Sequence, residues 1–229
     1  MSYFYVYDEF VQERRYEREL IRIEHRLTDI GIQGKIGRVA LFRHIGEIVR
    51  DEVKRGAETI VVVGDDNTFR NLMPILPELD VVVGLIPLGT KTRIAEVLGV
   101  AIGVEACDTL SARIVETLDV GRLNERYFFS SVEAFGADAA VDVGGKYRIQ
   151  AAASGGIEVR NVGSLAYADL HDGLANARDG LLEIVVHAEL PKESLWSRSK
   201  TTHSIFPMKK LGIVGTVPIS VMVDGVEDQ

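Results

Sequence analysis

The sequence is poor in cysteine and proline. Cys107 is its single cysteine among 229 residues. One thiol excludes an internal disulfide framework and is typical of a reducing compartment, where such a residue is usually a small part of the core. There are six prolines and no low-complexity tract, which indicates an ordinary folded globular chain rather than a disordered one.

A long apolar run is also missing. The longest one, VVVGLIPL, is far too short to span a bilayer, and the N-terminal MSYFYVYDEF lacks the basic start and apolar segment of a signal peptide. We therefore expect a cytoplasmic protein whose contact with lipid, where it occurs, is peripheral.

Basic residues are outnumbered by acidic ones, 26 Lys and Arg against 34 Asp and Glu. The formal net charge is -8, the pI is near 5.2, and the basic residues are dispersed along the chain. Because binding to a nucleic-acid backbone depends on clustered Lys and Arg, nucleic acid is not an expected partner.

The first half alternates strand and helix patterns. Strand-like runs lie at SYFYVYD, at residues 32–38, at TIVVV and at residues 80–88, and each is followed by an amphipathic or short helical pattern. This order predicts a Rossmann-like parallel α/β domain, in which ligands bind beyond the carboxyl ends of the strands.

The alternation of strand and helix patterns ends near Cys107. DTLSARIVETLDVG reads as a connecting helix, and the remainder consists of short strand-like runs separated by Gly and Pro, with SGG as one turn. We predict two domains, 1–106 and 107–229, the second a β-rich, antiparallel, sandwich-like domain. Since such a domain commonly leaves an edge strand open, a homodimer is one assembly to consider.

Two loops of the first half share one design. GDDNT and PLGTKTR each join a strand to a helix, with Gly64 or Gly89 at the turn and Thr68, or Thr90 or Thr92, as a helix N-cap candidate. In a parallel sheet these loops are neighbours, and free N–H groups at their helix starts favour an anion such as phosphate. The alternative is a pair of ordinary turns with ordinary caps.

In this order the loops resemble signatures of the diacylglycerol kinase and related lipid kinases. VVVGDDNT resembles G-G-D-G-T, and LIPLGTKTRIA resembles P-L-G-T-x-N-D-x-A. Further along the chain, ARDGLLEIVV resembles the family's D-G-x-L-D-V strand and VMVDGVE its closing D-G-E.

The resemblance implies a fold shared with NAD kinases and transfer of the ATP γ-phosphoryl group, with Mg²⁺, to a lipid or other hydroxyl in an interdomain cleft. It implies a phosphate- and nucleotide-binding set with Asp66 as a catalytic residue. The members of that set are Gly64, Asp66, Thr68, Gly89, Thr90, Lys91 and Arg93. Asp179 matches the Asp near the acceptor hydroxyl and is the candidate base, while Asp65 and Asp224 are the carboxylates to consider for a metal.

The sequence departs from the signatures where chemistry would occur. Asp65 and Asn67 replace glycines, Lys91, Thr92 and Arg93 occupy the Gly, Asn and Asp positions after Thr90, and YDEF stands in place of an N-P-x-x-G phosphate turn. Relative to the signatures, the first loop has one more negative charge. The facing loop has one fewer negative charge and two more positive charges.

These departures leave three hypotheses. The first is a divergent, active lipid kinase that binds a nucleotide and a lipid headgroup. The second is a catalytically inactive relative serving as a binding or assembly module, its phosphate site closed by pairing of Asp65 or Asp66 with Lys91 or Arg93. The third, an altered NAD or small-molecule kinase, is disfavoured because the later motifs follow the lipid-kinase order.

Overall fold

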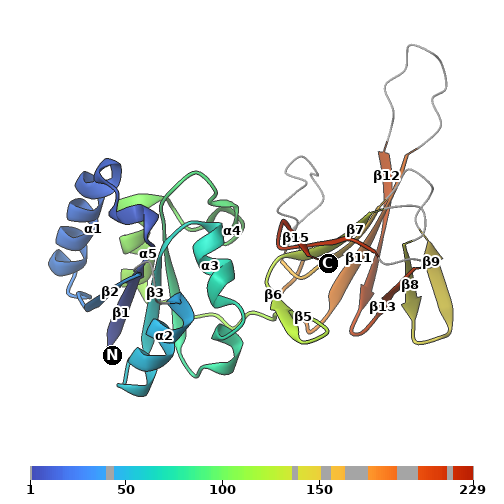
Figure 1. Cartoon of the computed structure of the whole chain (residues 1–229), viewed down its shortest axis with the longest axis horizontal. Helices are drawn as coiled ribbons and strands as arrows, with labels where there is room; N and C mark the ends of the chain where they lie inside the picture. The colour runs from blue at the N-terminus through green and yellow to red at the C-terminus, as the bar shows by residue number, and fades with distance from the viewer. Residues whose placement is uncertain are drawn as a thin grey trace, which may run out of the picture. The chain divides into compact units, whose positions relative to one another are not determined.

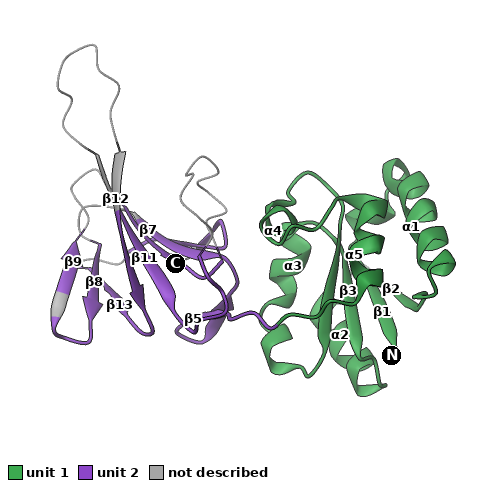
Figure 2. Ribbon diagram, turned by 180° about the vertical axis from the view of Figure 1, so that it is seen from behind, with its two compact units in different colours: residues 1–116 green, residues 117–229 purple. Residues whose placement is uncertain are grey.

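Four strands of the first half pair in parallel, as predicted from the sequence. The computed structural model describes residues 2–39, 44–135, 139–150, 156–162, 175–189, 201–215 and 219–228. The contacts divide the chain into two compact units, residues 1–116 and 117–229 (Figure 2). No helix among the described residues has the length and apolar character needed to cross a bilayer.

Unit 1 is built on a sheet with strand order β2-β1-β3-β4 (Figure 1). Its strands are β1 (Tyr3–Tyr7), β2 (Lys35–Arg38), β3 (Thr59–Gly64) and β4 (Val82–Pro87). All three pairings are parallel. Both β1 and β3 are buried along their whole length, which explains their unbroken apolar sequence.

Helices cover both faces of this sheet. The longer ones are α1 (Glu17–Asp29), α2 (Ile45–Lys54), α3 (Asp66–Leu72) and α5 (Ala106–Ala112), and α4 (Arg93–Val97) is a single short helix. Leu20, Ile23 and Leu27 of α1 share a buried cluster with Tyr5 and with Cys107 of α5. On the opposite face, α2 packs on β1 and α3 packs on β3 (Figures 1 and 2).

The boundary between the units lies ten residues beyond the predicted one. The expected split after residue 106 assigned α5 to the second domain, whereas α5 packs on β4 and α1 of unit 1. The helix expected over DTLSARIVETLDVG is also shorter than predicted, because Arg113 takes a left-handed conformation with φ of 54° and ends α5.

Unit 2 is an antiparallel sandwich, as predicted. Its sheets have the orders β12-β11-β10-β7-β14-β15 and β13-β8-β9, with a separate hairpin of β5 and β6. The strands are β5 (Gly121–Leu123), β6 (Arg126–Phe128), β7 (Ser131–Phe135), β8 (Ala140–Val143), β9 (Tyr147–Gln150), β10 (Gly156–Arg160), β11 (Leu182–Glu189), β12 (Thr201–Met208), β13 (Gly212–Val214), β14 (Val221–Val223) and β15 (Val226–Asp228). Ala134, Ile157 and Ile184 of the large sheet share a core with Val141 and Ile213 of the small one. The SGG turn lies largely outside the described residues.

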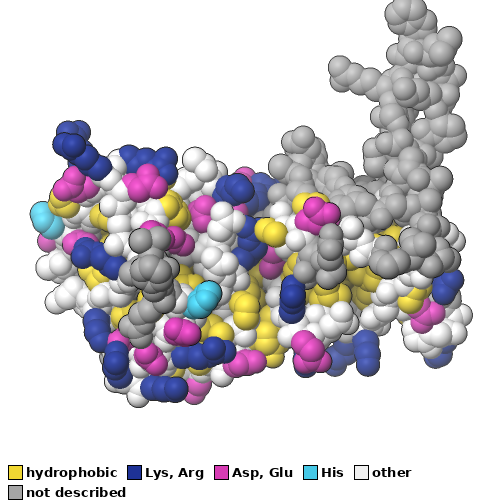
Figure 3. Space-filling view, viewed as in Figure 1, with side chains coloured by type: hydrophobic (Ala, Val, Ile, Leu, Met, Phe, Trp, Pro, Cys, Tyr) yellow, Lys and Arg dark blue, Asp and Glu magenta, His cyan; other side chains and the backbone are white. Residues whose placement is uncertain are grey.

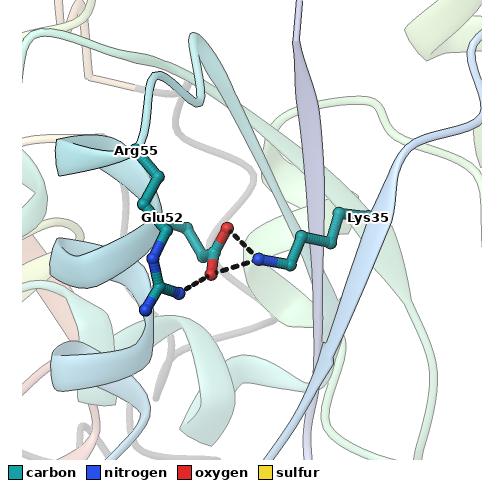
Figure 4. A network of polar contacts seen from close by, with 3 residues as sticks. All are labelled: Lys35, Glu52 and Arg55. Atoms are coloured by element: carbon teal, nitrogen blue, oxygen red, sulfur yellow. Dashed lines mark hydrogen bonds and ion pairs between the residues drawn. The ribbon is translucent and has the colours of Figure 1, made fainter.

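An ion-pair network joins β2 to α2 (Figure 4). The Lys35 ammonium lies 2.6 and 2.7 Å from the two carboxylate oxygens of Glu52, and Arg55 donates to the same carboxylate. Glu52 itself is buried, while the side chains of Lys35 and Arg55 are 60% and 64% exposed. The hydrogen bonds from Lys35 are the main cause of a lowered pKa for Glu52.

We predict that Glu52→Gln lowers the free energy of unfolding by about 1 kcal/mol at pH 7, since the exposure of both partners limits the strength of the network. A lowered folded-state pKa means that the stabilisation is present above the unfolded-state value, near 4.3, and is lost as pH falls below it. Urea unfolding at pH 7 and in acid measures both effects. Glu47→Gln, at an exposed position of the same helix, is the control; an equal loss in both variants would contradict the prediction.

Cys107 should behave as an inert core thiol. Burial raises its pKa to about 11, and its side chain is fully enclosed in the core beneath α1. At pH 8 we expect an aromatic disulfide reagent to label the native protein only as fast as the protein opens, and the urea-unfolded protein at once. Rapid stoichiometric labelling of the native protein would show that α5 does not pack as described.

Candidate functional site

The loops after β3 and β4 lie side by side at the carboxyl edge of the unit 1 sheet. Gly64 is in register with Pro87, and the Leu88 N–H donates to the Gly64 carbonyl at 2.8 Å. This arrangement confirms the prediction that GDDNT and PLGTKTR are neighbours.

Asp65 caps the helix that follows it. The N–H groups of Asn67 and Thr68 donate to Asp65 Oδ1 at 2.9 and 3.2 Å, and the Asp65 N–H donates to Thr68 Oγ1 at 3.1 Å. This reciprocal pair is a capping box. Thr68 was expected as the N-cap; it is instead the third helical residue, because Asp65, three positions earlier, supplies the stronger acceptor.

Thr68 also joins this loop to the one after β1. Its hydroxyl, which is fully buried, donates to Asp8 Oδ2 at 2.7 Å. A Cβ on Gly64 would lie 2.2 Å from the same hydroxyl, so glycine is required here by the close approach of Thr68. Gly64 therefore makes room for a side chain of the protein itself.

Asp66 caps the neighbouring helix. The N–H groups of Arg93 and Ile94, at the start of α4, each donate to one oxygen of its carboxylate at 2.9 Å. The Asp66 N–H donates to the Lys91 carbonyl at 2.8 Å. Burial raises the pKa of Asp66, the two backbone hydrogen bonds oppose that rise, and Asp65 adds to it.

The predicted pairing of Asp65 or Asp66 with the side chains of Lys91 or Arg93 is wrong. The Arg93 guanidinium lies 2.8 Å from Glu96 on its own helix, and Lys91 contacts Asp66 through its backbone carbonyl. The two loops are joined by a carboxylate and backbone N–H groups. Such a link needs no ordering of a long side chain, whereas a Lys or Arg partner would lose rotamer freedom.

Gly89 is packed between two loops. Its φ is 108°, and a Cβ there would lie 3.2 Å from Asp65 Cβ and from the ring of Phe10. Thr90 is exposed beside it, and Thr92, which precedes α4, makes no side-chain cap. Asp66 performs the capping that the sequence assigned to a threonine.

Asp8 and Phe10 are site residues that the motif analysis did not assign. The Asp8 carboxylate receives the Thr68 hydroxyl, and the Phe10 ring lies against the Gly89 position. Both come from YDEF, which stands in place of the phosphate turn. The missing phosphate turn directly after β1 is the sequence feature that could have identified these two residues.

Two further candidates lie in unit 2. Asp224 is buried, and its carboxylate accepts from the N–H groups of Phe129, Ser130 and Ser131 at 2.9, 2.6 and 3.2 Å. Asp179 lies in the exposed turn before β11, where its Oδ1 accepts from the Leu181 N–H at 2.9 Å. Asp224 thus organises the backbone between β6 and β7.

The residues present do not fit a nucleotide phosphate or its Mg²⁺ at the carboxyl edge of unit 1. The N–H groups that would receive an anion at the starts of α3 and α4 already donate to Asp65 and Asp66. Within the part of the chain that the structure describes, no three Asp, Glu, His or Cys side chains form a group that could hold a metal. The N–H groups at this edge bind the carboxylates of Asp65 and Asp66 in place of an external anion.

Comparison with known proteins identifies relatives of the chain. The family model of the diacylglycerol kinase catalytic domain matches residues 4–123. A diacylglycerol kinase of Mycobacterium tuberculosis, from strains H37Rv and CDC 1551 / Oshkosh, is 27% identical over 129 residues, which are 54% of this chain and 40% of the relative. The match therefore spans less than half the length of these curated relatives.

Solved structures give the same fold. The structure of a diacylglycerol kinase from Bacillus anthracis str. Sterne has a TM-score of 0.78 at 18% identity and covers 97% of this chain and 89% of its own. A second B. anthracis structure has a TM-score of 0.76 at 17% identity, with coverage of 98% and 88%. At these identities the likeness concerns the fold alone.

We predict that Asp66→Ala lowers the free energy of unfolding by about 2 to 4 kcal/mol, because it leaves two backbone donors at a buried helix start without their acceptor. Glu96→Ala, which removes only the exposed partner of Arg93, should cost less than about 0.5 kcal/mol. Denaturant unfolding of both variants measures the difference. Similar losses would mean that side-chain ion pairs, not the Asp66 carboxylate, hold α4.

Proposed function

Because the chain belongs to the diacylglycerol kinase catalytic domain family, whose model covers just over half of it, we propose that it is a non-phosphorylating member that serves as a binding module. The observation that carries this proposal is the double capping by adjacent carboxylates. Asp65 occupies the donors of α3, and Asp66 occupies those of α4.

Electrostatics support the proposal. A phosphate that entered this edge would meet Asp65 and Asp66 together. Two like unit charges about 4 Å apart at an effective dielectric near 20 repel by roughly 4 kcal/mol, which corresponds to about three orders of magnitude in affinity. The Asp65 carboxylate would also have to leave the α3 donors, and the Phe10 ring would have to move from Gly89. ATP and Mg²⁺ are therefore not cofactors of this member in our proposal.

A second candidate function is ATP-dependent phosphoryl transfer to a lipid hydroxyl. Two observations favour it, namely membership of a kinase family and the exposed carboxylate of Asp179 at the position that the family resemblance assigns to the acceptor site. In this alternative the capping carboxylates would have to give way when the nucleotide binds.

We expect titration calorimetry of the wild-type chain with Mg-ATP to give no binding heat at millimolar nucleotide. The double variant Asp65→Gly/Asn67→Gly restores both glycines of the family signature, and glycine at an N-cap costs only a few tenths of a kcal/mol. It should bind Mg-ATP measurably, with an affinity at least about tenfold above the wild type, because the competing anion is gone. Asp65→Ser is the matched comparison: it also removes the carboxylate, but its hydroxyl still occupies the α3 donors, so its gain in affinity should be smaller than that of the glycine variant.

Circular dichroism and thermal unfolding would verify that each variant is folded. Submillimolar binding of Mg-ATP by the wild type, followed by transfer of radiolabelled phosphate to diacylglycerol, would overturn the proposal and establish the second candidate. Binding without transfer would also contradict the proposal, because the N–H groups at the starts of α3 and α4 would then be available to the nucleotide in the wild type.

A further inference from the structure

Two carboxyl groups lie opposite each other in the middle of the large sheet of unit 2. Glu133 of β7 is in register with Glu158 of the antiparallel strand β10, so both side chains lie on the same face of the sheet. Their strand neighbours Ala134 and Ile157 point to the other face, into the core shared with the small sheet. Opposed residues of an antiparallel pair have Cβ atoms about 5 Å apart. We call Glu133 and Glu158 the carboxylate pair.

The carboxylate pair is buried, although it lies on the face of the large sheet away from that core. Each of its two residues is 1% exposed. On the face of the protein drawn in Figure 3, the acidic and basic side chains of unit 1 are interspersed at the surface, where water and opposite charges screen them. The carboxylate pair has no such screening by water, so two negative charges there would repel each other strongly.

Arg160 compensates one charge on this face of the sheet. Its guanidinium lies 2.9 Å from a carboxylate oxygen of Glu158, and its side chain is 4% exposed. The Ser131 hydroxyl donates to Oε1 of Glu133 at 3.2 Å. Arg160 is also in register with Glu183 of β11, for which burial is the main cause of a raised pKa. Three carboxyl groups thus lie around one guanidinium.

The residues that flank the carboxylate pair in the same cross-strand row are apolar. Val185 of β11 is in register with Glu158, and Met222 of β14 is in register with Glu133. The next charge along the row is Glu227 of β15, which is exposed. Among the residues that the structure describes, Asp, Glu, His and Cys side chains form no group of three that could hold a metal. A proton, by contrast, binds to two facing carboxyl groups without a third ligand.

We propose that the carboxylate pair binds a proton at near-neutral pH and makes unit 2 sensitive to pH. A buried carboxyl group is neutralised more readily than an exposed one, and a facing carboxylate strengthens that tendency. The proton from solvent neutralises one carboxylate, and Arg160 balances the charge that remains. Because the two groups titrate together, the proton belongs to the pair rather than to either residue. This inference does not depend on whether unit 1 transfers phosphate.

The bound proton links the stability of unit 2 to pH. The folded pair keeps a proton at pH values where the same side chains of the unfolded chain, with pKa values near 4.3, have lost theirs. The stabilisation is therefore fully present below about pH 4.3 and is lost as pH rises through the titration of the folded pair. Over that interval, one proton raises the equilibrium constant for opening by about tenfold per pH unit.

The test is amide hydrogen exchange of the whole chain at about pH 5.5 and pH 7.5, in the wild type and in Glu133→Gln. The amides of Ala134 and Ile157, which are in register, report the opening of β7 from β10. After correction for the intrinsic effect of pH on exchange, their opening constants should rise at least about tenfold in the wild type. In Glu133→Gln they should rise less than about twofold, because an amide does not titrate. Glu227→Gln, the same charge change at an exposed position of the same sheet, should behave like the wild type.

Carbon-13 NMR of the glutamate carboxyl carbons gives a second readout that does not require a variant to fold. In the wild type, at least one glutamate carboxyl group should titrate above about pH 6, and this titration should be absent from Glu133→Gln. Three results would overturn the proposal. They are titration of every glutamate near pH 4.3, equal pH dependence of opening in the wild type and Glu133→Gln, and loss of the pH dependence on addition of EDTA, which would assign a metal ion to the pair.

Discussion

The adjacent carboxylates of Asp65 and Asp66 each satisfy a different helix, and the rest of the unit 1 edge is arranged around this division. Consecutive residues at the end of a strand diverge, so one carboxylate turns back onto α3 and the other crosses to α4. Charge-assisted bonds to backbone N–H groups are about twice as strong as neutral ones. The pair therefore fixes the starts of two helices and fills the two places where a parallel α/β edge would bind an anion.

Other features of the edge are consistent with this closure. The Thr68 hydroxyl bonds Asp8 from the loop after β1, and the Phe10 ring lies at the Gly89 position. Three loops thus contact one another through side chains of the protein itself. Gly64 and Gly89 match the family signature, and in this chain they make room for Thr68 and Phe10. Their presence beside altered neighbours therefore does not imply that a nucleotide approaches them.

The fold was predictable because burial on both faces imposes unbroken apolar strands such as TIVVV, and because a parallel sheet brings successive strand ends to one edge. The partner of Asp66 was not predictable. Charge exchange between the loops suggested a side-chain ion pair with Arg93, but the direction of the Arg93 and Ile94 N–H groups depends on turn dihedrals that residue types do not specify. The end of α5 was missed for a similar reason, since a left-handed Arg113 has no signal comparable to glycine. The unit boundary lies at residue 116 instead of 106 because α5 packs on β4 and α1.

The four capped N–H groups remain bonded to Asp65 and Asp66 in the folded protein, and amide hydrogen exchange by NMR tests this most directly. The amides of Asn67, Thr68, Arg93 and Ile94 should exchange far more slowly than unprotected amides, and Mg-ATP should leave both their exchange and their chemical shifts unchanged. Exchange at unprotected rates, or a marked shift of these four amides on addition of Mg-ATP, would show that the carboxylates do not hold the edge closed.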